Sequence, residues 1–206
     1  MARIGIDFDD VLIKTAALVV SVYNKHHNTT LTVDDWYDLS PEALIRYNAS
    51  EPAEVVKRVM AIQGEDSFLV EPIDGAVEAL HALKDAGHEL IIITGRPESL
   101  RPQTIKNVQQ YFGDLFSSET VRFVDHFNHD ISGKRITKGD VATELKLDYF
   151  IDDVVSHANI VAGVGVKTFL LDMDYKWSKQ LADPRVVHVQ GWPEIVELID
   201  GQAGTN

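Results

Sequence analysis

Three carboxylates within four positions are the residues of this sequence with the clearest capacity for chemistry. Asp7, Asp9 and Asp10 directly follow Arg3-Ile4-Gly5-Ile6, which has the composition of a short buried strand. Carboxylates this close repel one another, most strongly beside a low-dielectric core, so a cation must lie among them or one of them must react. Asp7 and Asp9 are two residues apart, and at a strand end their side chains point to one side of the sheet. That arrangement can hold a divalent metal and leave one carboxylate oxygen free to attack.

Comparable polar groups follow the later apolar stretches of the chain. Thr94-Gly95-Arg96-Pro97 ends one buried run, and Asp152 and Asp153 end another. In open α/β sheets, ligands bind beyond the carboxyl ends of the strands. Groups that are distant in the sequence are therefore predicted to meet Asp7 at one rim of a sheet.

A lysine completes the set of candidate groups. Lys138 stands at the start of a predicted helix, where the helix dipole disfavours a cation. A phosphate partner would relieve this conflict, whereas the plain alternative is a solvated surface lysine, with Lys134 as the rival candidate. Plain alternatives exist for the other groups as well. The first acids would also suit a solvated turn or an N-cap pair, and the Thr-Gly-Arg-Pro segment would suit a simple turn. Capping of the next helix explains one member of the Asp-Asp pair but not both.

The elements that must position these groups form two kinds of segment. Residues 13 to 72 predict helices alone, with Thr32 and Ser40 as N-caps of short helices and Gly64 as the end signal of a longer one. The rest of the chain predicts alternating strands and helices, which indicates right-handed βαβ units and a parallel sheet. The predicted strands are 3–6, 89–93, 121–124, 149–151, 166–171 and, at an edge, 186–189. The predicted helices are 13–26, 51–62, 72–86, 100–112, 138–146, 153–162 and 192–199.

Composition limits the class of protein. The chain has 206 residues, which suits one domain or a core with a modest insert. It has no cysteine, so disulfides, thiolate metal sites and thiol nucleophiles are excluded. Its net charge of −13 argues against a nucleic-acid polymer or an anionic membrane as its main partner. We find no signal peptide and no apolar run of the ~20 residues that a membrane span needs, so we expect a cytoplasmic protein.

Taken together, the motifs carry a family resemblance. The order Asp-x-Asp-x-Val, Thr, Lys and Asp-Asp resembles the haloacid dehalogenase-like superfamily of phosphohydrolases. The resemblance implies an α/β fold: a Rossmann-like three-layer α/β/α core with a parallel sheet, and a helical C1-type cap inserted after the first strand. We assign residues 1–14 and 73–206 to the core and 15–72 to the cap. The early cap and the Phe-Ile-Asp-Asp segment are most similar to deoxyribonucleotidase-type 5′-nucleotidases.

The resemblance also implies catalytic roles. Asp7 would be the nucleophile that forms an aspartyl-phosphate, and Asp9 would be the general acid and then the base for the hydrolytic water. Thr94 would hydrogen-bond a phosphoryl oxygen. Lys138 would neutralise the phosphoryl group and orient Asp7. The implied substrate-binding residues are Thr94, Gly95, Arg96 and Lys138.

The resemblance further implies a Mg²⁺ cofactor. Asp7, the backbone carbonyl of Asp9 and the side chain of Asp153 would ligate the ion, and Asp152 would support this shell. Mg²⁺ prefers oxygen ligands and binds through one or two carboxylates plus substrate phosphate, which agrees with this set. The chain departs from the family pattern at Asp10, where glycine is usual, and no role is assigned to that residue. Asp tolerates unusual backbone conformations better than most residues, so we interpret the difference as a variant.

The predicted function is Mg²⁺-dependent phosphomonoester hydrolysis, acting on (deoxy)nucleoside monophosphates. The alternatives are a phosphatase for another small metabolite such as a sugar phosphate, and a non-catalytic phosphate-ligand binding protein. The predicted partner is a small phosphorylated metabolite, with no nucleic-acid polymer and no membrane, and a homodimer is left open. The run Asp125 to Asp130 suits a solvated loop, a metal cluster or the pocket mouth, and Arg46 is a further candidate for an anionic substrate. Trp36, Tyr37 and Tyr47 suit the cap core or stacking on a substrate base.

Overall fold

The computed structural model describes residues 1–36, 38–124 and 136–203. Tyr37, Lys134 and the Asp125–Asp130 run therefore lie outside the described residues, and the predictions made for them remain open. Across the described ranges, no helix combines the length and the apolar character needed to cross a membrane.

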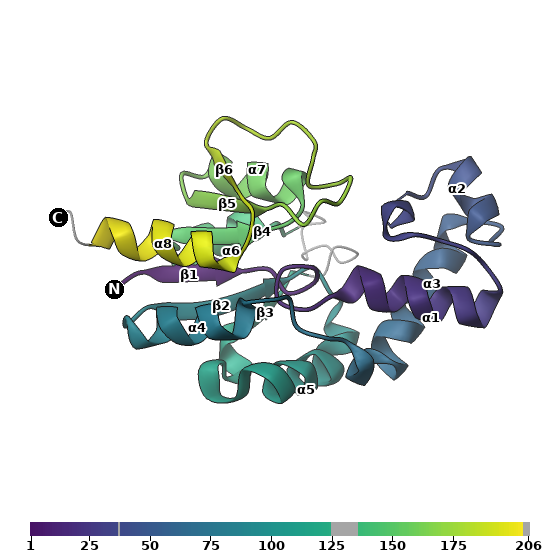
Figure 1. Cartoon of the computed structure of the whole chain (residues 1–206), viewed down its shortest axis with the longest axis horizontal. Helices are drawn as coiled ribbons and strands as arrows, with labels where there is room; N and C mark the ends of the chain where they lie inside the picture. Colours follow the sequence, from purple (N-terminus) through teal and green to yellow (C-terminus); the bar gives the residue numbers. More distant parts are fainter. Residues whose placement is uncertain (37, 125–135, 204–206) are drawn as a thin grey trace.

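A six-stranded parallel sheet forms the centre of the fold, as the alternating pattern predicts (Figure 1). The strand order is β3-β2-β1-β4-β5-β6, so the first strand of the chain lies inside the sheet. Its residues Ile4 and Ile6 are fully buried, in keeping with the continuous apolar strands of parallel sheets that are covered on both faces. The strands are β1 (Arg3–Ile6), β2 (Glu89–Thr94), β3 (Val121–Phe123), β4 (Tyr149–Asp152), β5 (Lys167–Leu171) and β6 (Val186–Val189).

Helices cover both faces of the sheet. On one face, Ile4 and Ile6 join a hydrophobic cluster with residues of α4 (Ala76–Asp85), α5 (Arg101–Phe112) and α8 (Trp192–Ala203). On the other face, α6 (Lys138–Leu145) and α7 (Val155–Gly163) pack over Phe150. Gly5 points to that second face, where an added Cβ would collide with Leu147, so the sequence needs glycine there. The resulting three layers confirm the predicted Rossmann-like α/β/α core.

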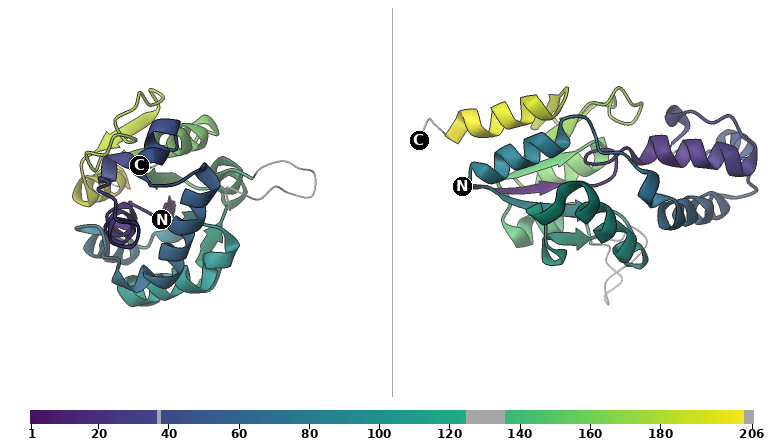
Figure 2. Two further views of the ribbon diagram at one scale, coloured as in Figure 1. Left: turned by 90° about the vertical axis from the view of Figure 1, so that its right-hand side faces the viewer. Right: turned by 60° about the horizontal axis from the view of Figure 1, so that its bottom comes forward.

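A helical cap follows the first strand, also as predicted. It contains α1 (Thr15–His27), α2 (Pro41–Arg46) and α3 (Pro52–Glu65), which lie beyond the carboxyl ends of the strands (Figures 1 and 2). Ser40 accepts a hydrogen bond from the Ala43 amide, and Pro41 is the first residue of α2. The cap has its own apolar cluster, in which Tyr23 and Tyr47 are buried. The boundaries given above for core and cap stay a prediction.

Several predicted helix ends are wrong: α1 and α4 begin later than predicted, at Thr15 and Ala76, and α8 continues to Ala203. Two other ends differ for a clear local reason. α3 continues through Gly64 to Glu65, because the Asp66 amide still donates to the Ile62 carbonyl at 2.9 Å. α7 begins at Val155, two residues later than predicted. There, the Val154 amide donates to Asp152 Oδ1 at 2.9 Å, which turns the chain before the helix starts.

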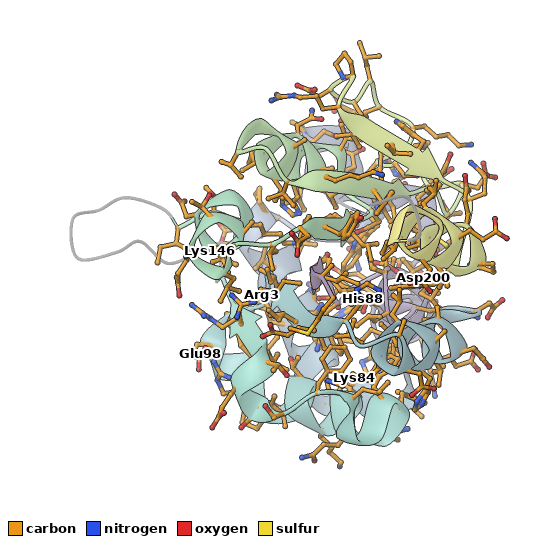
Figure 3. All side chains as sticks on the ribbon, turned by 90° about the vertical axis from the view of Figure 1, so that its left-hand side faces the viewer. Arg3, Lys84, His88, Glu98, Lys146 and Asp200 are labelled. Atoms are coloured by element: carbon orange, nitrogen blue, oxygen red, sulfur yellow. The ribbon has the colours of Figure 1, made fainter. Side chains whose placement is uncertain are left out.

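The end of the sheet opposite the cap is held by a histidine. His88 Nδ1 accepts a hydrogen bond from the Ala2 amide at 3.1 Å, and its Nε2 lies 3.0 Å from Asp200 Oδ1 (Figure 3). These contacts join the end of α8 to the first and second strands. The cap end is thus left for the polar groups that follow the strands.

Candidate active site

The loop after β1 places the first acids at the centre of the rim. The Asp7 amide donates to the Ile151 carbonyl at 2.9 Å, so this residue still pairs with β4 while its side chain passes the end of the sheet. Phe8 is fully buried and anchors the loop in the core. Asp7 is 5% exposed. The nucleophile candidate therefore lies at a rigid, almost dry position.

Asp10 now has a structural explanation. Its φ is 57°, the left-handed conformation that favours glycine and that Asp tolerates, so the variant interpretation of this position agrees with the backbone. Its fully buried carboxylate accepts hydrogen bonds from the Ala16 amide, at 3.0 Å to Oδ1 and 3.2 Å to Oδ2. Burial raises the pKa of Asp10 well above its usual value. This side chain thus fastens the first turn of α1, and with it the cap, to the loop that carries Asp7.

Lys138 lies between two acids. Its Nζ is 2.8 Å from Asp7 Oδ1 and 2.7 Å from Asp152 Oδ2, and its side chain is 2% exposed. Thr137 and Asp140 form a capping box that starts α6 at this residue. Burial opposes the charge of Lys138, but the charges of Asp152 and Asp7 outweigh it and raise the pKa of the ammonium. The dipole conflict noted in the sequence is thus resolved by these carboxylates.

The two acids respond differently to this lysine. Burial raises the pKa of Asp7 to about 6, with Asp152 and Asp9 adding to the rise and Lys138 opposing it. Asp152 is also buried, but the neighbouring Lys138 and His157 outweigh burial and hold its pKa well below its usual value. One lysine therefore does not neutralise the cluster, and a further cation would favour the ionised form of Asp7.

A divalent metal ion would suit Asp153, the acid of the cluster that has not yet been described. One carboxylate oxygen each from Asp7, Asp152 and Asp153 lie within 4.8 Å of one another, and all three residues are buried. Asp153 Oδ2 accepts a hydrogen bond from Trp177 Nε1, whereas Asp153 Oδ1 has no hydrogen-bond partner among the described residues. A buried carboxylate oxygen left in this way is suited to a hard cation with oxygen ligands. Both oxygens of Asp152 are engaged, by Lys138 and by the Val154 amide, which suits a supporting position.

Asp9 is held by a different set of partners. Arg96 binds it in a bidentate manner, with Nε 2.9 Å from Oδ2 and Nη2 2.7 Å from Oδ1. Thr15 Oγ1 donates to Asp9 Oδ1 at 2.5 Å. The guanidinium of Arg96 lies over the Phe8 ring, 4.9 Å from its centroid. Asp9 and Arg96 both line the pocket, so any anion that enters competes with Asp9 for Arg96.

Thr94 is fully buried at the end of β2. Its Oγ1 accepts a hydrogen bond from the Arg96 amide at 3.1 Å, which leaves its own hydroxyl hydrogen able to donate. Gly95 and Arg96 line the pocket next to it. Arg46 is placed elsewhere: it pairs with Asp35 at 2.7 Å on the cap and does not line the pocket.

A pocket of about 430 Å³ lies between core and cap. Its core wall carries the charged groups, including Asp7, Asp9 and Lys138. Its cap wall is mainly apolar and aromatic: Trp36, Leu39, Tyr47, Val55, Val56, Val59, Met60 and Gln63. A phosphoryl group would suit the first wall, and a weakly polar group would suit the second.

Several of these residues were not identified from the sequence. Thr15, His157 and Trp177 carry no motif, and each reaches the acids only through the fold. The apolar residues of α3 lie in a helix that was predicted, but no role in a site was assigned to them. Val55 and Val59 also line the pocket, which periodicity alone does not show.

The fold and site define a capped α/β enzyme of the hydrolase type, and comparison with known proteins identifies its family. Residues 4–129 match the model of the haloacid dehalogenase-like hydrolases. The chain belongs to this family.

Two similar proteins carry names that are consistent with a hydrolase family. A protein of Oceanobacillus iheyensis named "Putative nucleotidase" is 24% identical over 185 residues, covering 87% of this chain and 92% of its own. A Bacillus cereus protein with the same designation is 23% identical over 207 residues, covering 96% of this chain and 97% of its own.

Solved structures support the fold. A haloacid dehalogenase family hydrolase from Deinococcus radiodurans, with bound phosphate and sodium, has a TM-score of 0.66 at 15% identity, covering 98% of this chain and 96% of its own. A predicted phosphoglycolate phosphatase from Haemophilus somnus has the same score and identity, with coverages of 97% and 98%.

Proposed function

We propose that this protein is a Mg²⁺-dependent phosphomonoesterase that acts through an aspartyl-phosphate on (deoxy)nucleoside monophosphates. The observation that carries the proposal is the buried pair of Asp7 and Lys138, which lines a pocket with a mainly apolar cap wall and adjoins the acid cluster that contains Asp153. Mg²⁺, held by Asp7 and Asp153 with Asp152 in support, would supply positive charge to the phosphoryl oxygens.

The proposed reaction uses two steps. In the first, an Asp7 oxygen bonds to phosphorus as the bond to the leaving oxygen breaks, and Asp9 gives that oxygen a proton. In the second, water attacks the phosphorus of the aspartyl-phosphate, Asp9 takes the proton, and Asp7 is released with inorganic phosphate. Lys138 and the Thr94 hydroxyl stabilise charge on the phosphoryl oxygens. Asp9 enters the first step protonated, so Arg96 would release one of its two contacts with Asp9 before that step.

The cap wall supports a nucleoside as leaving group. Trp36, Val59 and Met60 offer aromatic and apolar groups to the pocket, which suits the weakly polar faces of a base. The described cap residues that line the pocket include no Lys or Arg. A leaving group with its own carboxylate or second phosphate would thus lack a counterion there. Two relatives named as nucleotidases are consistent with this choice.

A sugar phosphate remains the second candidate, because Ser156 and His157 add polar groups to the core wall. A homodimer and a cytoplasmic location remain predictions of the sequence.

Phosphate release from an aryl phosphate, with and without Mg²⁺, tests the reaction, and a panel of nucleotides and sugar phosphates ranked by kcat/KM tests the substrate. A clear preference for sugar phosphates would end the nucleotide proposal. Tight phosphate-ligand binding without turnover in Mg²⁺ would instead indicate a binding protein.

The amide of Gln63 provides a sharper test of the cap. We expect Gln63→Leu to lower kcat/KM for the preferred nucleotide about three- to ten-fold, the effect of one lost hydrogen bond, and to leave the aryl phosphate unaffected. Gln110→Leu on the exposed surface of α5 is the matched control. Equal losses on both substrates would show that Gln63 acts on the fold or the chemistry rather than on the leaving group.

Mg²⁺ is expected to stabilise the folded protein. At a concentration about 100 times its Kd, binding contributes about 2.7 kcal/mol, which for a chain of this size is a rise in Tm of about 5–10 °C. Thermal melts with Mg²⁺, against NaCl of equal ionic strength, measure this rise. Asp153→Asn should remove most of it. A rise of the same size in that variant would place the ion elsewhere.

A further inference from the structure

The segment between β5 and β6 starts at the carboxyl end of β5, the strand next to β4, and reaches the acid cluster there. It brings Trp177 against Asp153, where the indole Nε1 donates to Oδ2 at 2.5 Å. Trp177 is 6% exposed and Asp153 is 1% exposed, so neither group is hydrated. A hydrogen bond in such surroundings is strong and fixes the orientation of both partners.

Contacts within the segment hold the indole in place. The Asp172 amide donates to the Val189 carbonyl at 2.8 Å, which ties the start of the segment to β6. The buried Ser178 has its Oγ 3.0 Å from Asp172 Oδ1 and 2.9 Å from the Tyr175 carbonyl. Tyr175 stacks on Trp177, with 4.4 Å between ring centroids and 30° between planes. Trp177 is therefore a preorganised donor rather than a side chain that meets Asp153 by chance.

The Trp177 donor is uncharged, which affects how well Asp153 can bind a cation. Lys138 brings positive charge to the acids that it contacts, whereas an indole N–H orients a carboxylate and adds no charge of its own. Asp153 Oδ1, the oxygen left over, is buried and has no hydrogen-bond partner within the described ranges. Asp153 belongs to the cluster in which one carboxylate oxygen each from Asp7, Asp152 and Asp153 lie within 4.8 Å of one another. One oxygen of Asp153 is thus held by the protein, while the other is left for a ligand.

We propose that Trp177 is a positioning residue that sets the rotation of Asp153 so that Oδ1 is presented to a divalent metal ion. This inference rests on the proposed function, because it assumes that the acid cluster holds Mg²⁺. It assigns a role in the site to a segment in which the sequence shows no motif. Hydrogen-bond partners that orient metal ligands typically change metal affinity 10- to 100-fold when they are removed, and the same size of effect is expected here.

Isothermal titration of Mg²⁺ into the full-length protein tests the inference directly. Trp177→Phe keeps an aromatic ring for stacking and removes the N–H, so we expect the Kd for Mg²⁺ to rise about 10- to 100-fold. Trp192→Phe is the matched control, because Trp192 is also buried and donates its indole N–H, at 3.0 Å, to the Val11 carbonyl. Both variants should lose some thermal stability, but Trp192→Phe should keep the wild-type affinity. Equal affinity in Trp177→Phe and wild type, or equal losses in both variants, would overturn the inference.

A second measurement applies if Trp177→Phe does not fold. The chain has three tryptophans, so the double variant Trp36→Phe/Trp192→Phe keeps Trp177 as its single indole. Its emission should change on titration with Mg²⁺, with the midpoint that calorimetry gives for the same variant. If calorimetry shows Mg²⁺ binding but the fluorescence emission of this variant does not change, the role of Trp177 is overturned and the phosphatase proposal still stands. If wild-type protein does not bind Mg²⁺ and hydrolyses phosphate esters without it, the metal part of the proposed function fails, and this inference with it.

Discussion

Replacing Asp7 by Asn is expected to abolish phosphate release, with kcat reduced by at least about 10⁴-fold, because the amide cannot form an acyl-phosphate. The variant removes a single charge and keeps the shape of the side chain. Acid quench of the wild-type enzyme during turnover of a ³²P-labelled substrate should leave label on the protein, and Asp7→Asn should carry none. Full activity in the variant would refute the mechanism.

The same variant separates catalysis from stability. Because burial raises the pKa of Asp7 from 3.8 to about 6, the folded state binds its proton more tightly than the unfolded chain does. The ionised group therefore destabilises the fold above about pH 6, and this effect disappears as the pH falls below the unfolded pKa. Without Mg²⁺, Asp7→Asn should melt no lower than wild type at pH 7.5. Asp74→Asn, on an exposed carboxylate outside the pocket, should change neither activity nor Tm appreciably.

Lys138→Met is expected to damage both stability and activity. The lysine is the shared cation of two buried carboxylates, Asp7 and Asp152. Removing one partner of a buried ion pair leaves uncompensated charge, so the free energy of unfolding should fall by about 3–5 kcal/mol. The loss of positive charge beside the phosphoryl group should lower kcat by about 10²- to 10³-fold.

Urea unfolding and steady-state kinetics measure these two effects. Lys106→Met is the matched control, because Lys106 is an exposed lysine of α5. It should change both the free energy of unfolding and kcat only slightly. Mg²⁺ should restore part of the lost stability in Lys138→Met, since it brings positive charge to the same carboxylates. Unchanged stability in that variant would mean that the acids are neutralised by another group.

The cap shows which features were predictable before the structure. Ser40 and Pro41 start a helix through local geometry, and the absence of strand patterns between residues 13 and 72 predicted an all-helical insert. The wall that this insert presents to the pocket was not predictable. Val55 and Val59 would show the same periodicity whether they packed inside the cap or lined a cavity, because periodicity records which face is apolar and not what covers it.

By itself, the sequence determined the parallel sheet and the rim at which Asp7, Lys138, Asp152 and Asp153 meet. Strand ends follow from local apolar runs, and right-handed crossovers bring their carboxyl ends to one edge. Only the tertiary structure decided how those acids are paired. Arg96 binds Asp9 across 87 positions, and Trp177 binds Asp153 from another segment, two contacts that depend on how distant parts of the chain pack. A side chain's type sets which bonds it can form, but its partner is set by the neighbours that the fold brings within about 3 Å.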